Sequence, residues 1–482
     1  MNTHRSGWLV LLVSLAAMST AEAQQDNPHI GYVYPAGGRQ GTTFEALLGG
    51  QHLDGASVAR ISGGGVKAEV VEHVRPLNQG QFKEMQNRMG ELKKRKEAAI
   101  PGESRRGRRG RRGSSPTSTS TDWTDEDEKK LAEIRERLAT FSIRRSSVPA
   151  LVETVTLRVT LAADAEPGQR ELRLQTELGV TNPLVFCVGQ LPEVAEESAR
   201  SVAVAESQQR GGRGRKRQQS ARPDPGTSPT TTAPEVETDV TLPVIVNGQI
   251  LPGDVDRYRF RARQGQHLVV DCSARKLIPY LSDAVPGWFQ ATVALLDADG
   301  KEVAYEDDFH FHPDPVLHCE IPEDGVYTIE IRDALYRGRE DFVYRMALGE
   351  LPLVTDVFPL GCQAGQQTTF SLNGWNLAQT ELTRTFPDSG MHTISVSEGG
   401  VVSSSVPLSV DTLPEHLESE PNNNPADAQR VALPTIINGR VDGPGDVDVF
   451  CIECRATAEI VAEVYARRLN SSLDSVIKLT SA

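Results

Sequence analysis

Short runs of alternating apolar and polar residues, separated by Gly, Pro, Asn and Asp, fill most of the chain and predict β-strands. The clearest run is 254–260, where Asp, aromatic and apolar residues lie two apart after Asn-Gly and a Pro-Gly turn. The same pattern returns at 446–450, again after Asn-Gly and a Gly-rich turn. The chain is therefore expected to be mainly β and to contain an internal repeat.

The repeat extends beyond this motif, since 268–270 matches 460–462 and 273–277 matches 465–469. A second pattern, a Pro/Gly turn, a period-2 strand and a closing Gly, occurs at 34–53 and returns at 358–377. We name the second pattern the A module and the first the B module, so the order is A-B-A-B. The predicted parts are a signal peptide (1–23), a first A module (27–192), a linker (193–238), a first B module (239–351), a second A module (352–415) and a second B module (416–482).

Residues 78–146 interrupt the first A module, and their apolar spacing is helical. The first stripe consists of Phe82, Met85, Met89 and Leu92, and the second of Leu131, Ile134, Leu138 and Phe141. Thr124 and Asp127 approximate a capping box at the start of the second helix. An antiparallel helical hairpin packed on itself is predicted, and an arm that binds a partner remains the alternative.

The N-terminal sequence predicts export, and the composition of the linker predicts disorder. The start combines a short basic region, an apolar run and Ala21-Glu22-Ala23, which is typical of a secretory signal, so an extracellular, periplasmic or cell-surface location is expected. No later run is long enough to span a membrane. The net charge is -14, which opposes general nucleic-acid binding. The basic clusters at 105–112 and 210–217 are interpreted as solvated, with polyanion binding as the alternative. The Gly-, Ser-, Thr- and Pro-rich segment 193–238 is predicted to be disordered.

The B pattern, Asn-Gly, then Gly-Asp-Val-Asp-x-Tyr/Phe, a strand and the turn at 297–300, resembles the bacterial pre-peptidase C-terminal domain. This resemblance implies a small jelly-roll β-sandwich of a kind found beside secreted peptidases. The A pattern, P-x-G-x-x-x-G ending in L-x-G-x-x-L, resembles the immunoglobulin-like fold shared by plexins and transcription factors. Together they imply tandem β-sandwiches with an inserted helical hairpin.

An acidic segment before the second B module is the leading candidate site. Glu418-Ser419-Glu420-Pro421-Asn422-Asn423 resembles the linker that binds calcium in the collagen-binding domains of bacterial collagenases. The resemblance implies a calcium site formed by Glu418, Glu420, Asn422 and Asn423 and completed by Asp446 or Asp448. The alternative is that these residues only close turns. In the first B module Glu235-Val236-Glu237 is out of register, so the resemblance does not extend to a calcium site there.

Other chemical signatures are weaker. Two S-x-x-K matches, at 273–276 and 475–478, are not shared between the repeats, and the six cysteines are not shared either, so neither pattern predicts a site. Cys451 and Cys454 have the spacing of a zinc half-site but lie on a predicted strand, where residues three apart face opposite ways. His310, His312, His318 and Cys319 could supply ligands for a transition metal, and a solvated strand edge is the alternative.

These patterns predict a secreted, non-catalytic array that acts in surface binding, adhesion or as an accessory region, with an extracellular protein or polysaccharide as its ligand. The alternative is the non-catalytic portion of a secreted peptidase or other hydrolase whose catalytic domain lies outside this chain. The second B module stops in the strand that matches 291–296. A fragment of a longer protein is therefore expected.

Overall fold

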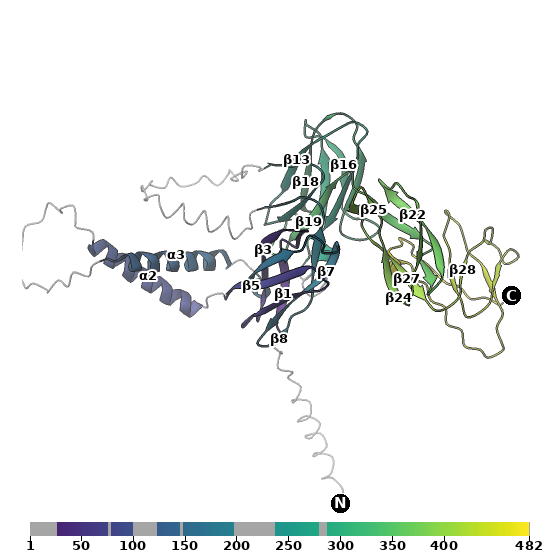
Figure 1. The fold of residues 1–482 in the computed structure, drawn as a ribbon, viewed down its shortest axis with the longest axis horizontal. Helices are drawn as coiled ribbons and strands as arrows, with labels where there is room; N and C mark the ends of the chain where they lie inside the picture. Colours follow the sequence, from purple (N-terminus) through teal and green to yellow (C-terminus); the bar gives the residue numbers. More distant parts are fainter. Residues whose placement is uncertain are drawn as a thin grey trace, which may run out of the picture.

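The computed structural model describes residues 27–75, 79–99, 123–144, 148–196, 237–278 and 287–481. The predicted signal peptide and both basic clusters lie outside these residues. The fold is mainly β and consists of sandwiches that follow one another along the chain (Figure 1), which confirms the predicted class.

The first A module packs two sheets, β1-β3-β6-β5 and β2-β9-β7-β4, around one core. Its strands are β1 (His29–Tyr34), β2 (Gly37–Arg39), β3 (Thr43–Gln51), β4 (Val58–Ile61), β5 (Val66–Val74), β6 (Glu153–Leu161), β7 (Gly168–Thr176), β8 (Gly179–Val180) and β9 (Leu184–Gly189). In β6 the residues from Val155 to Leu161 alternate between the core and the surface, because successive side chains of a strand point to opposite faces.

The first B module is a sandwich of two five-stranded sheets, β10-β12-β19-β14-β17 and β11-β13-β18-β15-β16. Its strands are β10 (Glu193–Ala195), β11 (Glu237–Asp239), β12 (Val244–Gln249), β13 (Asp256–Ala262), β14 (His267–Ser273), β15 (Ala291–Leu296), β16 (Glu302–Glu306), β17 (Val316–Glu320), β18 (Gly325–Asp333) and β19 (Val343–Gly349). Assigning 193–238 wholly to a disordered linker was wrong at both ends, because β10 and β11 form parallel edge strands of the two sheets.

The second A module repeats this design with shorter sheets, β20-β22-β23 and β21-β27-β24. Its strands are β20 (Leu353–Phe358), β21 (Gly361–Gln363), β22 (Gln367–Trp375), β23 (Glu381–Thr385), β24 (Gly390–Ile394), β25 (Ser397–Glu398), β26 (Val401–Val402) and β27 (Val406–Asp411).

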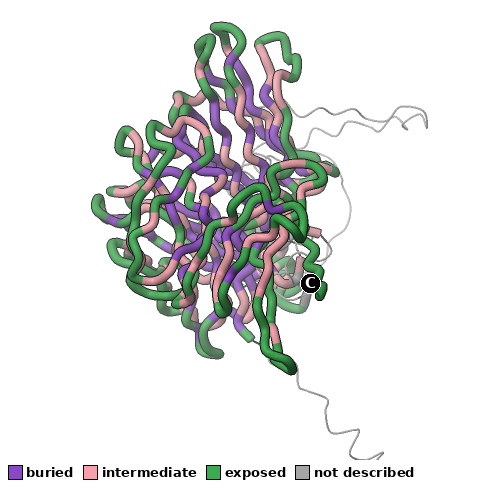
Figure 2. Tube along the Cα trace, turned by 90° about the vertical axis from the view of Figure 1, so that its right-hand side faces the viewer, coloured by how far each residue is buried: buried purple, intermediate pink, exposed green. Residues whose placement is uncertain are grey.

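The second B module contains two parallel pairs, β28 (Glu415–Leu417) with β30 (Ile436–Asn438) and β29 (Gln429–Val431) with β31 (Phe450–Ile452). The predicted match between 460–462 and β14 does not extend to structure, because residues 453–481 form no strand. In the first B module β14 pairs with β17 and β19, and the described residues of the second supply no such partners. Accordingly, the segment near the C-terminus is mostly exposed or intermediate (Figure 2).

The insertion forms the predicted helical hairpin, α2 (Gln79–Ala99) and α3 (Asp125–Arg144). Arg95 and Lys96, late in α2, pair with Asp127 and Glu128, early in α3, so the helices are antiparallel. The capping box is also present, since the N–H of Asp127 donates to Thr124 Oγ1 at 3.3 Å and the N–H of Thr124 to Asp127 Oδ2 at 3.4 Å. The hairpin projects from the first A module (Figure 1). No helix in the described part of the chain is long and apolar enough to cross a membrane.

Each B module docks on the A module that precedes it in the same way. A 3-10 helix, η2 (Arg275–Leu277) in the first and η4 (Arg467–Leu469) in the second, contacts β9 and β27 respectively. The predicted match of 273–277 with 465–469 therefore holds in structure. Since both its sequence and its docking recur, the structural repeat is the pair of one A and one B module.

Candidate metal centre

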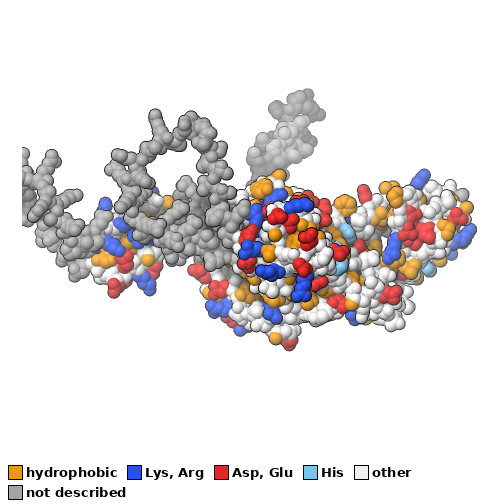
Figure 3. Space-filling model, turned by 90° about the horizontal axis from the view of Figure 1, so that it is seen from above, with side chains coloured by type: hydrophobic (Ala, Val, Ile, Leu, Met, Phe, Trp, Pro, Cys, Tyr) orange, Lys and Arg blue, Asp and Glu red, His pale blue; other side chains and the backbone are white. Residues whose placement is uncertain are grey.

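Three of the six predicted calcium ligands converge in the second B module. Glu418 follows β28, Glu420 lies two residues later and Asp448 precedes β31. Each offers one carboxylate oxygen, and these atoms all lie within 4.8 Å of one another. We name these three residues the acidic cluster. Acidic side chains are also visible at this end of the molecule in Figure 3.

The loop that carries the cluster is fastened to the strand opposite. The N–H of Asn422 donates to Glu420 Oε2 at 2.8 Å, and the carbonyl oxygen of Asn422 accepts from Val449 N at 3.1 Å. Asn423 Oδ1 accepts from Val447 N at 3.0 Å. These bonds bring Glu420 beside Asp448 although 28 positions separate them in the sequence, so the loop 418–423 and the segment 447–449 form one site.

Four polar atoms of the site are buried without hydrogen-bond partners. Glu418 Oε2, Asp448 Oδ1 and both polar atoms of the Asn422 side chain are inaccessible and unpartnered, and Asn422 is fully buried. A Cβ atom added at Gly439 would lie 2.5 Å from Glu418 Oε2, so the Gly of the Asn-Gly motif leaves room beside the carboxylate. Unpaired buried carboxylate oxygens are costly, and these donors fit a hard cation that takes oxygen ligands.

Burial and mutual repulsion perturb the acidic cluster. Burial, together with the smaller effects of the Asp448, Glu420 and Asp442 charges, raises the pKa of Glu418 to about 7, against the opposing effect of a hydrogen bond from Arg440 N. The pKa of Asp448 is also raised, first by burial and then by Asp446 and Glu420. Such a cluster holds either protons or a cation.

The other predicted ligands have structural roles. Asp446 Oδ2 accepts the N–H of Asp442 at 2.6 Å and closes the turn before β31, and Asn423 holds the loop through Val447. Of the two Asp residues predicted to complete the site, Asp448 is the one that lies with Glu418 and Glu420. The full burial of Asn422, which brings its amide beside the carboxylates, could not be read from spacing alone.

The first B module contains an equivalent of the segment 415–418. The sequence comparison placed it at 235–237, which was wrong. Glu193–Ala195 pairs in parallel with β12, and Glu415–Leu417 pairs with β30 in the same register. Glu193 also binds Asn247 as Glu415 binds Asn438. The counterpart of Glu418 is therefore Glu196, about 40 residues upstream of Glu235-Val236-Glu237. Sequence alignment missed it because 40 residues, 197–236, lie in the first module where the second has only nine, 419–427.

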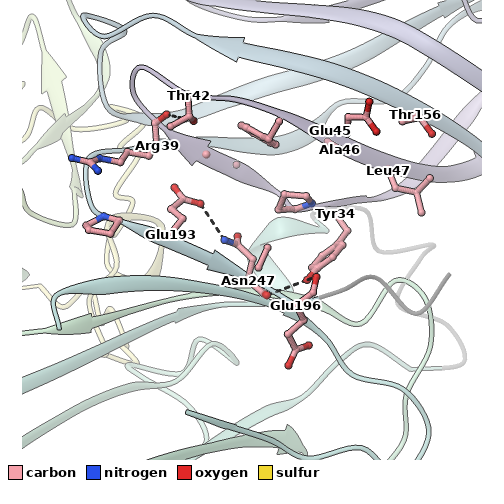
Figure 4. Close-up of a pocket in the computed structure, with 16 residues that line it drawn as sticks. Tyr34, Arg39, Thr42, Glu45, Ala46, Leu47, Thr156, Glu193, Glu196 and Asn247 are labelled. Atoms are coloured by element: carbon pink, nitrogen blue, oxygen red, sulfur yellow. Dashed lines mark hydrogen bonds between the residues drawn. The ribbon is translucent and has the colours of Figure 1, made fainter. Parts of the chain in front are cut away.

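Glu196 also borders a cleft of about 740 Å³ between the first A and first B modules (Figure 4). On the B side, Glu193 and Asn247 are joined by a hydrogen bond. On the A side, the Tyr34 hydroxyl donates to the carbonyl oxygens of Glu196 at 2.9 Å and Asn247 at 3.1 Å. These two hydrogen bonds of Tyr34 hold the first A module against the first B module, and we name this contact the seam.

The histidines are not assembled into a metal site. His318 stacks on Trp375 with ring centroids 4.7 Å apart, and its Nε2 lies 3.4 Å from His267 Nδ1, at the junction between the first B and second A modules. His310 and Phe311 form the tip of a tight hairpin with positive φ angles. The described residues bring three or more metal-binding donors within 4.8 Å of one another at two places only, and neither includes these histidines or Cys319, Cys451 or Cys454.

The second such group consists of Asp54, His73 and Glu153 of the first A module, and its carboxylates take part in hydrogen bonds and an ion pair within that module. The Glu153 carboxylate accepts the N–H groups of His52 at 3.1 Å and Leu53 at 2.8 Å, and His73 Nε2 lies 3.3 Å from it. Asp54 pairs with Arg75. None of these carboxylate oxygens is among the buried atoms without a partner, whereas Glu418 Oε2 and Asp448 Oδ1 of the acidic cluster are.

Comparison with known proteins gives limited matches. No family model matches the chain. A probable subtilase-type serine protease of Deinococcus radiodurans is 34% identical over 80 residues, which cover 17% of this chain and 10% of the protease. The chain therefore matches only a small part of that relative's length.

Among solved structures, the pre-peptidase C-terminal domain of a Bacillus anthracis collagenase is similar over 24% of this chain and 97% of its own, at 15% identity and a TM-score of 0.19. A periplasmic inhibitor of g-type lysozyme from Aeromonas hydrophila is similar over 24% of this chain and 98% of its own, at 14% identity and a TM-score of 0.16. Similarities at these TM-scores carry no argument about function.

Proposed function

We propose that the chain is an exported, non-catalytic binding or accessory array whose second B module holds one Ca²⁺ ion. Glu418, Glu420 and Asp448 would bind the ion, with the Asn422 amide oxygen beside them. The observation that carries the proposal is the set of buried carboxylate and amide oxygens that have no hydrogen-bond partner. The coordinated ion would replace the missing partners.

The donor set favours calcium over other metals. Every donor is an oxygen, whereas zinc and copper favour sites with His or Cys. The ligands come from a loop and a strand end, and Ca²⁺ tolerates such irregular geometry better than Mg²⁺, which requires a near-ideal octahedron. Two positive charges would offset most of the charge of three carboxylates.

The ion would act as a structural clamp. Glu418 directly follows β28, the strand that continues from the second A module, and Asp448 lies at the start of the segment that leads into β31. Binding both would fix where the second B module begins relative to the A module before it. A binding or accessory array needs its modules held in a fixed orientation, and the bound ion would provide this rigidity at the junction of the second A and second B modules.

Thermal unfolding of the full chain, with Ca²⁺ or with EDTA, tests the proposal. We expect calcium to raise the melting temperature of the transition that includes the second B module, since a ligand at 100 times its Kd stabilises the folded state by about 2.7 kcal/mol. E418Q and D448N should lose the shift. E459Q, which changes an exposed acid in the same module, is the matched control and should keep it. No shift in the wild type, or an equal shift in E418Q, would contradict calcium binding here.

A second candidate is the accessory portion of a secreted peptidase. It is favoured by the 80-residue match to a probable subtilase-type protease. The adjoining genomic sequence tests it, because a peptidase domain in the same reading frame would support it. A stop codon directly after Ala482 would contradict it and leave the free-standing array.

A further inference from the structure

The first B module repeats the geometry of the acidic cluster with different occupants. Glu196 stands where Glu418 stands, and Asp256 where Asp448 stands, because the Gly-Asp-Val-Asp motifs of the two modules correspond residue by residue. The bond to Glu418 from Arg440 N has its counterpart in a contact of 3.5 Å from Gln249 N to Glu196 Oε2. The two carboxylates thus occupy equivalent places.

What surrounds the pair differs. The nine residues 419–427, which include Glu420 and Asn422, have no counterpart of similar length, since the first module has residues 197–236 at that place in the sequence. The first module has two phenol groups beside the carboxylates instead. Tyr258 corresponds to Phe450 of the second module, and Tyr344 lies on β19. Tyr258, Tyr344 and Asp256 are all buried.

The contacts of this group require one more proton than the two phenols carry. Tyr344 Oη lies 2.6 Å from Asp256 Oδ2, Tyr258 Oη lies 3.3 Å from Glu196 Oε1, and the two hydroxyl oxygens are 2.7 Å apart. Each of these three oxygen pairs needs a proton between them to be a hydrogen bond. The hydroxyls supply two protons, so the third must reside on a carboxyl group.

We infer that the first B module binds a proton at the place where the second has its acidic cluster, and that Glu196 and Asp256 share this proton at the seam with the first A module. In one arrangement that satisfies all three contacts, a protonated Glu196 donates to Tyr258, Tyr258 donates to Tyr344, and Tyr344 donates to Asp256. The inference does not depend on whether the second module binds calcium.

The surroundings of the pair agree with a bound proton. Among the residues that the structure describes, the titratable groups that face it are Tyr34 of β1, Tyr258 of β13, Tyr344 of β19 and Asp254 of the preceding turn, and none of these is a cation. Burial is the first cause that raises the pKa of both carboxyls, to about 7 for Glu196 and about 8 for Asp256, and the Glu196 charge is the second cause for Asp256. Ionising both would leave two buried charges without compensation.

The site also touches the seam. Tyr34 reaches from the first A module to the carbonyl oxygen of Glu196 (Figure 4), so the residue that holds the proton also holds the neighbouring module. A carboxyl whose pKa is raised on folding stabilises the folded state at low pH, and this contribution is lost as the pH rises through the folded pKa. The stability that the proton contributes should therefore be lost progressively between about pH 4, near the pKa of an unfolded carboxyl group, and about pH 8.

Unfolding of the full chain in EDTA between pH 5 and 9.5 tests the inference. The melting temperature of the wild type should fall by a few degrees from pH 5 to 8 and level off above pH 8. The melting temperature of D256N should fall by less than half as much over the same pH range, because its amide is uncharged like the protonated acid. The comparison is made in the E418Q/D448N background, which removes the titrating carboxyls of the second module, and E459Q, which changes an exposed acid there, is the control that should leave the pH dependence unchanged. Equal pH dependence with and without D256N would overturn the inference.

Infrared spectroscopy gives a second readout that does not require a variant of Asp256 to fold. At pH 6 the E418Q/D448N variant, which lacks the titrating carboxyls of the second module, should show the carbonyl stretch of a protonated, buried carboxyl group. This band should disappear on titration to pH 9.5 and be absent at pH 6 when E196Q is added. A band that is absent from E418Q/D448N at pH 6 would contradict a shared proton. A calcium-induced rise in melting temperature that survives in E418Q/D448N would show that the first module binds a cation instead.

Discussion

At the level of single residues, the two B modules differ in how they compensate the same pair of carboxylates. In the second, Phe450 offers no hydroxyl, and the buried oxygens of Glu418 and Asp448 remain without partners. In the first, the hydroxyl of Tyr258 fills the corresponding space. The sequence could show that Tyr258 and Phe450 are equivalent, but not that a hydroxyl there points at a carboxylate, since Glu196 and Tyr344 come from distant parts of the chain.

The raised pKa of Glu418 makes a prediction about calcium affinity. The carboxyl must lose its proton before it can bind the ion, and its pKa lies at about 7. We expect the Kd for Ca²⁺, measured by isothermal titration, to be nearly constant from pH 9 to 8 and to rise as the pH falls below 7, by up to about tenfold per unit for one competing proton. A Kd that does not change between pH 8 and 5.5 would contradict the role of Glu418.

A second prediction at this scale concerns the ion pair of Arg345 and Glu193. Both side chains are nearly buried, and the two nitrogen-oxygen contacts are each 2.6 Å long. Removing one partner leaves a buried charge, which costs about 3–5 kcal/mol. In urea denaturation, E193Q should shift the midpoint of the first B module to clearly lower urea, and E193Q/R345M should recover part of the loss. If E193Q unfolds like the wild type, the strand β10 does not belong to this module in solution.

At the level of elements, the strands and helices with strong periodicity could be predicted, and the shortest strands could not. The stripes of the helical insertion and the alternation in β6 and β13 are local signals. β10 and β11 have three residues each and pair in parallel with strands that begin 51 and 19 residues later, β12 at Val244 and β13 at Asp256. Nothing local marks such strands, and the polar composition around them is typical of a linker.

The helical hairpin gives the prediction at this scale. It joins β5 and β6, which are neighbours in one sheet and pair antiparallel along their length. A short turn could therefore replace it, as in other antiparallel connections. Deleting 78–146 should leave a first A module with native-like thermal stability, and the far-ultraviolet circular dichroism should lose its helical component. Loss of cooperative unfolding would show that the hairpin is part of the sandwich and not a peripheral arm.

At the level of the whole molecule, the chain consists of two A-B pairs in series, with the helical hairpin projecting from the first (Figure 1). The end of the first A module also reaches the second: Gln190 Nε2 donates to Gly400 O at 3.2 Å, and Gln190 Oε1 accepts from Val402 N at 2.9 Å. The pairs are therefore joined beyond the chain connection. Their order was predictable from the repeat, whereas this contact, made by residues 210 positions apart, was not.

The proposed function is non-catalytic, and this makes a prediction about activity. We expect the purified chain to leave casein, gelatin and common ester and glycan substrates unchanged. Turnover that follows the protein through purification and is abolished by changing one Ser, Cys, Asp or Glu would contradict a non-catalytic function.

The central claim is that one B module holds a cation where the other holds a proton, and the calcium stoichiometry of the full chain tests it most directly. Equilibrium dialysis at pH 8 should give one bound Ca²⁺ per chain for the wild type, one for D256N and none for E418Q/D448N. Two ions per chain, or one ion that is lost in D256N and retained in E418Q/D448N, would contradict the account.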